Sequence, residues 1–209
     1  MNMESFVAYK GKELSPLTIV DAFFKRFPDM FLGIQTMDDL VFVQAFFHQQ
    51  RAQNHFGLAC KKDILIASAF EQEQIARVAR KFRSRYAISD PAEYLLLIQK
   101  IYGDYDTEMF KELSVHANFC AVIWDQRKKQ MLAGVTTPLK YFTHLHYGYT
   151  PQNHECIFSN DIKLLSLLVK DVITMEANTY MRDGVVYPIN GANYSDENGF
   201  QLSRKRELN

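Results

Sequence analysis

The order of strand-like and helical segments most restricts what this 209-residue chain can fold into. Segments with strand character come first, amphipathic helical segments occupy the middle, and strand-like segments return near the end. Because strands and helices do not alternate, the order argues against a parallel sheet with crossover helices. No internal repeat or linker divides the chain. The sequence therefore predicts an α+β fold, with one domain over residues 1–189 and a polar, partly disordered tail over 190–209.

The first segments have clear local boundaries. Phe6–Lys10 is a short β-prone run that ends at Gly11. Ser15 suits the N-cap of a helix and Pro16 its first turn, while Pro28 would end that helix. Further strands are expected over three apolar runs, the first two of them paired: Phe31–Ile34, Leu40–Phe47 and Asp63–Ala69.

The middle and the end of the chain continue this pattern. Helical spacing predicts helices over Glu71–Phe82, over Asp90–Ile101 with Gly103 at its end, over Thr107–Leu113 and over Asp161–Lys170. Strands are expected over Phe119–Trp124, Gln130–Val135, Leu139–His146 and Ile157–Ser159. Thr179–Met181 and Val185–Tyr187 flank a strong hairpin turn at Arg182–Gly184.

Charge and apolar content argue against several partners. The 24 basic and 24 acidic residues cancel, so the chain is not expected to bind nucleic acid. A local basic group is more typical of a solvated helix face: Arg77, Arg80, Lys81, Arg83 and Arg85. No apolar run approaches the roughly 20 residues that span a bilayer, and the first residues do not resemble a signal peptide. We therefore expect no membrane partner.

The cysteines and histidines give weak signals for chemistry. Cys60, Cys120 and Cys156 are odd in number and far apart, which favours free thiols in a reducing cytoplasm. Cys120 lies inside an apolar run and is expected to be a buried, inert thiol. His144 and His146 would share one face of a strand, but no third ligand lies near them in the sequence. The sequence predicts neither a metal nor a cofactor.

A series of motifs in the same order resembles the glutaminase domain of class II glutamine amidotransferases, as in asparagine synthetases and β-lactam synthetases. The matching segments run from residue 3 to residue 187, and the second half matches better. They are Met3–Tyr9, Lys25–Asp29, Ile64–Ala69, Ser89–Glu93, Ala117–Asp125, Gly134–Phe142, Phe158–Leu165 and Asn178–Gly184. This resemblance implies the four-layer αββα sandwich of N-terminal nucleophile hydrolases.

The residues that carry the family's chemistry are altered. Glu4 falls where the family has its N-terminal cysteine nucleophile, and a carboxylate cannot replace that thiol. Ile66-Ala67 stand in place of an Asn-Gly oxyanion pair. Phe46 or Phe47 takes the place of the arginine that binds the glutamine carboxylate. Only Ser89 and Asp90 retain a glutamine-binding feature, so they are the candidate ligand-binding residues, and no catalytic residue is assigned.

The resemblance therefore suggests a catalytically inactive glutaminase-like domain that works by binding. Its partner would be a separately encoded synthetase-type subunit, since the chain ends soon after the first domain, or a second copy of itself. One alternative is an amide hydrolase of changed specificity, with Ser5 exposed by self-cleavage as an N-terminal nucleophile. Another is an amino-acid-sensing module that uses Ser89 and Asp90. The pathway and the ligand stay open.

Overall fold

The computed structural model describes residues 5–46, 58–61, 63–70, 72–86, 94–136 and 144–189. Within them the chain forms two antiparallel six-stranded sheets and a small number of helices. The predicted α+β class is confirmed. The expected polar tail over 190–209 lies outside the described residues. No described helix combines the length and the apolar character that crossing a membrane requires.

The first sheet has the strand order β10-β8-β9-β1-β3-β2. Its strands are β1 (Phe6–Lys10), β2 (Phe31–Met37), β3 (Leu40–Phe46), β8 (His146–Tyr149), β9 (Cys156–Ser159) and β10 (Val172–Thr174). The interior strand β1 pairs with β3 and β9, so that Phe6 lies opposite Gln44 and Val7 lies opposite Ser159. The amino end of β1 is therefore placed beside the carboxyl ends of β3 and β9.

The second sheet has the strand order β12-β11-β7-β6-β5-β4. Its strands are β4 (Leu58–Lys61), β5 (Ile64–Phe70), β6 (Phe119–Asp125), β7 (Gln130–Val135), β11 (Thr179–Arg182) and β12 (Val185–Pro188). Strands β5, β6 and β7 pair along almost their whole length. The last hairpin adds to β7 at the edge, where Met181 lies opposite Ala133.

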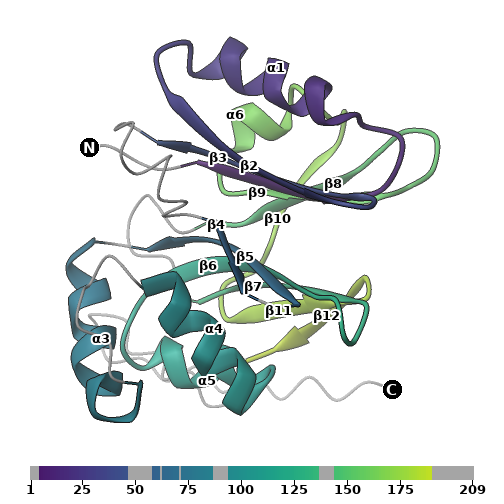
Figure 1. Cartoon of the computed structure of the whole chain (residues 1–209). Helices are drawn as coiled ribbons and strands as arrows, with labels where there is room; N and C mark the ends of the chain where they lie inside the picture. The colour runs from purple at the N-terminus through teal and green to yellow at the C-terminus, as the bar shows by residue number, and fades with distance from the viewer. Residues whose placement is uncertain are drawn as a thin grey trace, which may run out of the picture.

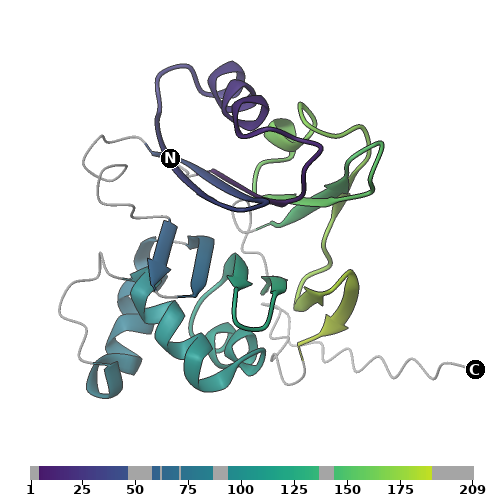
Figure 2. The same ribbon diagram turned by 45° about the vertical axis from the view of Figure 1, so that its right-hand side comes forward.

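Helices lie on the outer face of each sheet (Figure 1). The described helices are α1 (Pro16–Arg26), α3 (Gln72–Tyr86), α4 (Tyr94–Tyr105), α5 (Glu108–Ser114) and the single turn α6 (Ile162–Leu165). Figure 1 shows α1 and α6 over the first sheet, and α3, α4 and α5 over the second. The turned view in Figure 2 shows the two sheets facing each other, with these helices outside.

Three apolar cores account for this arrangement. One joins α1 and α6 to the first sheet and includes Phe23 and Val7. A second lies between the two sheets and includes Phe6, and a third joins the second sheet to its helices and includes Phe110. Side chains alternate along a strand, so the interior strands are apolar on both faces because each face meets a core. This explains why β1, β3 and β6 read as nearly continuous apolar runs.

Several predicted boundaries are confirmed with their physical cause. Ser15 Oγ accepts a hydrogen bond from Thr18 N–H at 3.1 Å and caps α1, whose first residue is Pro16. The paired strands β2 and β3 are joined at Asp38, which has φ +53°. At the last hairpin Asp183 and Gly184 have φ +52° and +80°, as a two-residue turn of type I′ requires.

Other boundaries are corrected by the tertiary structure. The prediction of a strand over Leu139–His146 is wrong for the residues of this range that the structure describes, 144–146, because β8 begins only at His146. Of the helix expected over Asp161–Lys170, only Ile162–Leu165 forms a helix, α6. The following residues Leu168 and Val169 are buried against the first sheet, and the chain then enters β10.

Helix α4 also differs from its expected end. It continues through Gly103 to Tyr105, because its last turn contacts α3. Tyr86 donates a hydrogen bond to Asp104 at 2.7 Å, and Arg85 donates one to Tyr105 at 2.7 Å. The short edge strands β4 and β10 were not expected from the sequence.

Candidate functional site

The amino end of β1 is the candidate site, because the motif order places the family's reacting group there. Ser5 directly precedes β1, and only 2% of its surface is exposed. Its carbonyl accepts a hydrogen bond from Ala45 N–H at 2.8 Å. The next N–H group, that of Phe6, donates to Asn160 Oδ1 at 2.8 Å. The backbone around Ser5 is thus held from two sides, by β3 and by the residue that follows β9.

The end of β9 completes this anchor. Ser159 Oγ donates to the Phe6 carbonyl at 2.7 Å and accepts from Asp161 N–H at 3.0 Å. Asp161 caps α6 through Leu164 N–H at 2.9 Å, and its carboxylate lies 3.3 Å from the Arg26 guanidinium of α1. One run of three polar residues therefore ties the start of β1 to both helices on this face.

Gln44 brings a further polar side chain to this end of β1. It is fully buried and lies opposite Phe6 in the β1–β3 register. Its neighbour Val43 faces the helix-side core, so Gln44 points into the space between the sheets. Sequence reasoning missed both Gln44 and Asn160. The available signal for Gln44 was a polar residue that interrupts the apolar run Leu40–Phe46.

The positions expected to have lost family groups are apolar where they are described. Phe46 ends β3 and is fully buried. On β5, Ile66 packs into the core beneath the helices and Ala67 into the core between the sheets. None of these three side chains can donate a hydrogen bond. Glu4 and Phe47 lie outside the described residues.

The described cysteine side chains are poor nucleophiles. Cys120 is buried in the core between the sheets, and desolvation raises the pKa of its thiol to about 12. Burial also raises the pKa of the Cys156 thiol to about 12. A thiol must lose its proton to attack, so both are inert near neutral pH. The expectation of a buried, inert Cys120 is confirmed.

The two histidines that suggested a possible metal site lie close together, but only one is on a strand. The ring centroids of His144 and His146 are 6.1 Å apart, and His144 precedes β8. His146 Nδ1 is 2.9 Å from Thr174 Oγ1 on the neighbouring strand. Burial, with a smaller contribution from His144, lowers the pKa of His146. No group of three possible metal ligands occurs among the described residues.

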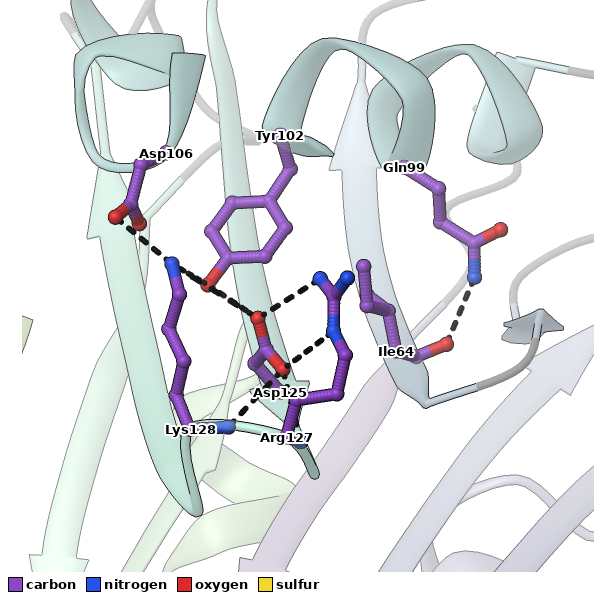
Figure 3. Close-up of polar contacts among 7 residues, drawn as sticks. All are labelled: Ile64, Gln99, Tyr102, Asp106, Asp125, Arg127 and Lys128. Carbon is purple, nitrogen blue, oxygen red and sulfur yellow. Dashed lines mark hydrogen bonds and ion pairs between the residues drawn. The ribbon is translucent and has the colours of Figure 1, made fainter. Parts of the chain in front are cut away.

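A denser polar cluster lies in the second sheet, at the turn after β6 (Figure 3). Asp125 is fully buried and accepts hydrogen bonds from Arg127 N–H at 3.0 Å, Lys128 N–H at 3.3 Å and Tyr102 Oη at 3.1 Å. The Arg127 side chain also donates to both carboxylate oxygens. Lys128 Nζ reaches Asp106 at 2.8 Å. These contacts join α4 to the β6–β7 turn.

The electrostatics of this turn fit a structural role. Burial alone would raise the pKa of Asp125, but the hydrogen bonds from Arg127, Lys128 and Tyr102 outweigh it and hold that pKa below its usual range. Figure 3 also shows Gln99 of α4 donating to the Ile64 carbonyl at 2.8 Å. The donors to Asp125 come from the β6–β7 turn and from α4, so its carboxylate fixes the turn against that helix.

A second carboxylate cluster joins the loops after β1 and β8. Glu155 accepts hydrogen bonds from Tyr9 Oη and from the N–H groups of Lys12 and Glu13. Burial would raise the pKa of Glu155, but the Tyr9 hydroxyl and these N–H groups hold it below its usual value. An added Cβ at Gly11 would meet the Glu155 carboxylate and the Tyr9 hydroxyl, so a larger residue there would displace the ends of these two side chains. These hydrogen bonds hold the loop after β1 against the loop after β8.

The predicted ligand-binding pair, Ser89 and Asp90, lies outside the described residues. The structure therefore does not test whether these two side chains lie near Ser5. The described part of the candidate site consists of Ser5 and the neutral polar side chains around it: Gln44, Ser159 and Asn160.

Comparisons with known proteins address the fold. No family model matches the chain, and no curated protein sequence matches it. Among solved structures, glutamine phosphoribosylpyrophosphate amidotransferase from B. subtilis, complexed with ADP and GMP, matches with a TM-score of 0.59 at 12% identity. The match covers 88% of this chain and 48% of that chain. This chain therefore spans about half the length of that enzyme.

A glutamine aminotransferase class-II domain protein from Silicibacter pomeroyi also matches, with a TM-score of 0.48 at 10% identity. That match covers 87% of this chain and 95% of the other. At such low identity, structural likeness speaks for the fold alone. The two antiparallel sheets, the position of β1 and the match to the amidotransferase agree with the motif order: this chain has the fold of a class II glutamine amidotransferase domain.

Proposed function

We propose that this protein is a glutaminase-like domain that does not hydrolyse glutamine and acts by binding a protein partner. In this proposal its layers form the four-layer αββα sandwich of N-terminal nucleophile hydrolases, with the reaction chemistry lost. The partner is a synthetase-type subunit of a biosynthetic enzyme, related to asparagine synthetases, or a second copy of the chain. The glutamine-dependent enzyme from B. subtilis supports the fold of this proposal and not its partner.

The observation that carries the proposal is the apolar character of three positions. Ile66 and Ala67 are buried in cores at the positions where the motif comparison places the oxyanion pair. Phe46, which with Phe47 is one of two candidates for the position of the carboxylate-binding arginine, is fully buried. Hydrolysis of an amide needs donors that stabilise a developing oxyanion, and removing one such donor typically slows an enzyme about 100- to 1,000-fold. Because Ile66 stands in place of the asparagine and its side chain offers no donor, we expect a glutaminase mechanism to fail even if a nucleophile were supplied.

The test measures glutamate released from glutamine by the purified full chain, beside an active class II amidotransferase as the positive control. We expect no release above the level of buffer alone. Release that follows the protein through purification and saturates with glutamine would overturn the proposal. Co-purification from a tagged chain then asks whether a synthetase-type subunit is bound.

The alternative of an amide hydrolase with a processed N-terminus has one observation in its favour. Ser5 is buried at the start of β1, with its carbonyl and the following N–H group held in place. If cleavage after Glu4 exposed its amine, that amine could serve as the base for its own hydroxyl. Intact-mass measurement separates the two candidates: a chain that starts at Ser5, with amide hydrolysis lost in Ser5→Ala, would favour this alternative.

A further inference from the structure

Trp124, the only tryptophan of the chain, lies near the end of β6 in the core between the two sheets. It is 6% exposed, and its cross-strand neighbours are Leu65 on β5 and Met131 on β7. Its buried indole Nε1–H donates to no acceptor in the part of the chain that the structure describes. A buried N–H group without an acceptor is costly, and the indole nitrogen can only donate. This side chain is therefore not explained by the packing of the core alone.

A lysine of the other sheet lies over the same ring. Lys10 ends β1, and its Nζ is 4.4 Å from the centroid of the Trp124 ring. Side chains alternate along β1, so Lys10 faces the second sheet, as Phe6 and Ala8 do. A cation over an indole face is favourable, but it leaves the N–H groups of the ammonium to find acceptors elsewhere. Among the described residues, no carboxylate forms an ion pair with Lys10.

The side chains around these two donors are apolar or only weakly polar. Lys10 lies opposite Leu40 in the β1–β3 register. On its other side is Cys156, which directly precedes the β9 partner of Tyr9. The neighbours of Trp124 are a leucine and a methionine. Thiols and thioethers are weak acceptors, and the remaining side chains accept nothing. A cation and an indole N–H thus share surroundings without a strong acceptor.

This end of the core between the sheets is partly exposed. Met37, Met131 and Cys156 pack against the core but are only partly buried, and Lys10 is intermediate as well. Methionine side chains are flexible and adapt to apolar groups of varied shape. Ser5 lies at the other end of β1, about 16 Å away along the strand. The two donors are therefore separate from the candidate site described above.

We propose that Lys10 and Trp124 bind the carboxylate group of a small apolar acid. The carboxylate accepts hydrogen bonds from Lys10 Nζ and from the indole Nε1–H, and the partly exposed methionines Met37 and Met131 contact the apolar tail. With hydrogen bonds of about 2.9 Å, one oxygen can bridge two nitrogens up to about 5.8 Å apart. The 4.4 Å between Lys10 Nζ and the ring centroid lies within that reach.

The kind and number of donors favour a carboxylate over a phosphate. A phosphate group carries nearly two charges and three strongly accepting oxygens, so its sites usually combine several cations or backbone N–H groups. Here one cation and one N–H group are set among apolar side chains, which matches one negative charge on an apolar tail. This binding goes beyond the proposed function, and neither requires the other.

Because the chain has a single tryptophan, its fluorescence reports on this site directly. Sodium hexanoate is titrated into the full chain at constant ionic strength, with hexanamide as the neutral analogue and inorganic phosphate as the other anion. We expect a saturating change in emission with hexanoate, half complete near about 1 mM for a ligand of this size. Hexanamide and phosphate should bind about tenfold more weakly or worse, because the first lacks the charge and the second lacks the tail.

Matched variants assign the effect to the two donors. Lys10→Met keeps the apolar stem and removes the cation, so we expect binding of hexanoate to weaken by about tenfold or more. Lys12→Met is the control: Lys12 is exposed, and its hydrogen bonds to Glu155 use the backbone N–H, which methionine keeps. Trp124→Phe keeps a ring without the N–H and should also bind more weakly, measured by calorimetry. Circular dichroism checks that each variant folds.

Equal affinity of wild type and Lys10→Met for hexanoate would overturn the proposal, as would equal responses to hexanoate and hexanamide or tighter binding of phosphate. If Trp124→Phe does not fold, the contrast between Lys10→Met and Lys12→Met decides the question alone. Glutamine hydrolysis is assayed on the same samples. Its presence would refute the proposed function and leave this site standing, whereas a chain without hydrolysis that ignores hexanoate would refute only this site.

Discussion

The amino end of β1 and the turn after β6 are both polar regions at strand ends, yet they are built differently. Around Ser5 the buried polar side chains of Gln44, Ser159 and Asn160 are neutral, and Ser159 and Asn160 hold the backbone of Phe6. The turn after β6 is built on a carboxylate, Asp125, which gathers two backbone N–H groups, a guanidinium and a phenol.

The two regions therefore differ in whether a charged side chain holds the backbone in place. A buried carboxylate is tolerated only when donors surround it. Asp125 accepts from its own turn and from Tyr102, and the partly buried Glu155 accepts from Tyr9 and the loop after β1. The candidate site instead keeps its backbone in place with groups that have no charge to activate a nucleophile. The hydrogen bonds of the two charged clusters join loops and helices of the scaffold, and those of the described part of the candidate site hold the backbone of β1.

Acidification should produce the largest effect, because it acts on several carboxylates together. The folded-state pKa values of Asp125, Glu155 and Glu13 lie below normal, so the unfolded chain binds more protons than the folded one at low pH. Their contribution is complete above the unfolded values of about 3.9 to 4.3. We expect it to be lost as the pH falls through the lower folded values. Urea denaturation at a series of pH values measures this loss.

The double variant Asp125→Asn with Glu155→Gln is the control for the acid series. It should make the profile below about pH 4.3 shallower, since two of the three titrating carboxylates are gone and Glu13 remains. The decline that starts near pH 6.5 should remain, because burial lowers the folded-state pKa of His116 and His146. An unchanged profile below pH 4.3 would contradict the assignment of these two carboxylates as stabilising anions.

Asp125→Ala should be the most damaging single substitution in the comparison. It leaves the buried Tyr102 hydroxyl and two turn N–H groups without their acceptor, and we expect a loss of about 2–3 kcal/mol in the free energy of unfolding. Chemical denaturation measures it. Tyr102→Phe removes only one of the donors and should cost less. Equal losses for the two variants would mean that the phenol, and not the turn, dominates.

Asn160→Ala tests the neutral anchor at the candidate site. It removes the acceptor of the buried Phe6 N–H, so we expect a loss of about 1–2 kcal/mol in the free energy of unfolding. Asn153→Ala is the matched control, since Asn153 is exposed and contributes its backbone N–H, which alanine keeps. Slower hydrogen exchange at Phe6 in the variant than in wild type would contradict the assignment.

Ser68 and Ser159 give the smallest and sharpest contrast. Both are fully buried serines near strand ends, but Ser159 Oγ has two hydrogen-bond partners and Ser68 Oγ has none within the described part of the chain. Ser159→Ala should lower the free energy of unfolding by about 1 kcal/mol. Ser68→Ala should leave it unchanged or raise it by up to about 1 kcal/mol, because a buried hydroxyl without a partner is costly. A clear loss of stability in Ser68→Ala would show that its hydroxyl has a partner after all.

The candidate site was only partly predictable, because some of its residues lie far apart in the sequence. Ser5 was found because it stands at the start of a β-prone run and beside the altered nucleophile position. Asn160 was missed, because its contact with Phe6 joins residues 154 positions apart, and no local pattern encodes such a contact. Gln44 was visible as a polar residue in an apolar run, but only the register with Phe6 gives it a place in the site.

The sequence by itself determined the elements whose causes lie within a few residues: the Ser15 cap, the turn at Asp183-Gly184, the apolar interior strands and, through them, the α+β class. Only the tertiary structure decided where α4 and α6 end, which short segments become edge strands, and which side chains surround Ser5. Caps and turns depend on local hydrogen bonds and backbone angles. Helix ends and sheet edges depend on burial against distant segments, which can override local preference.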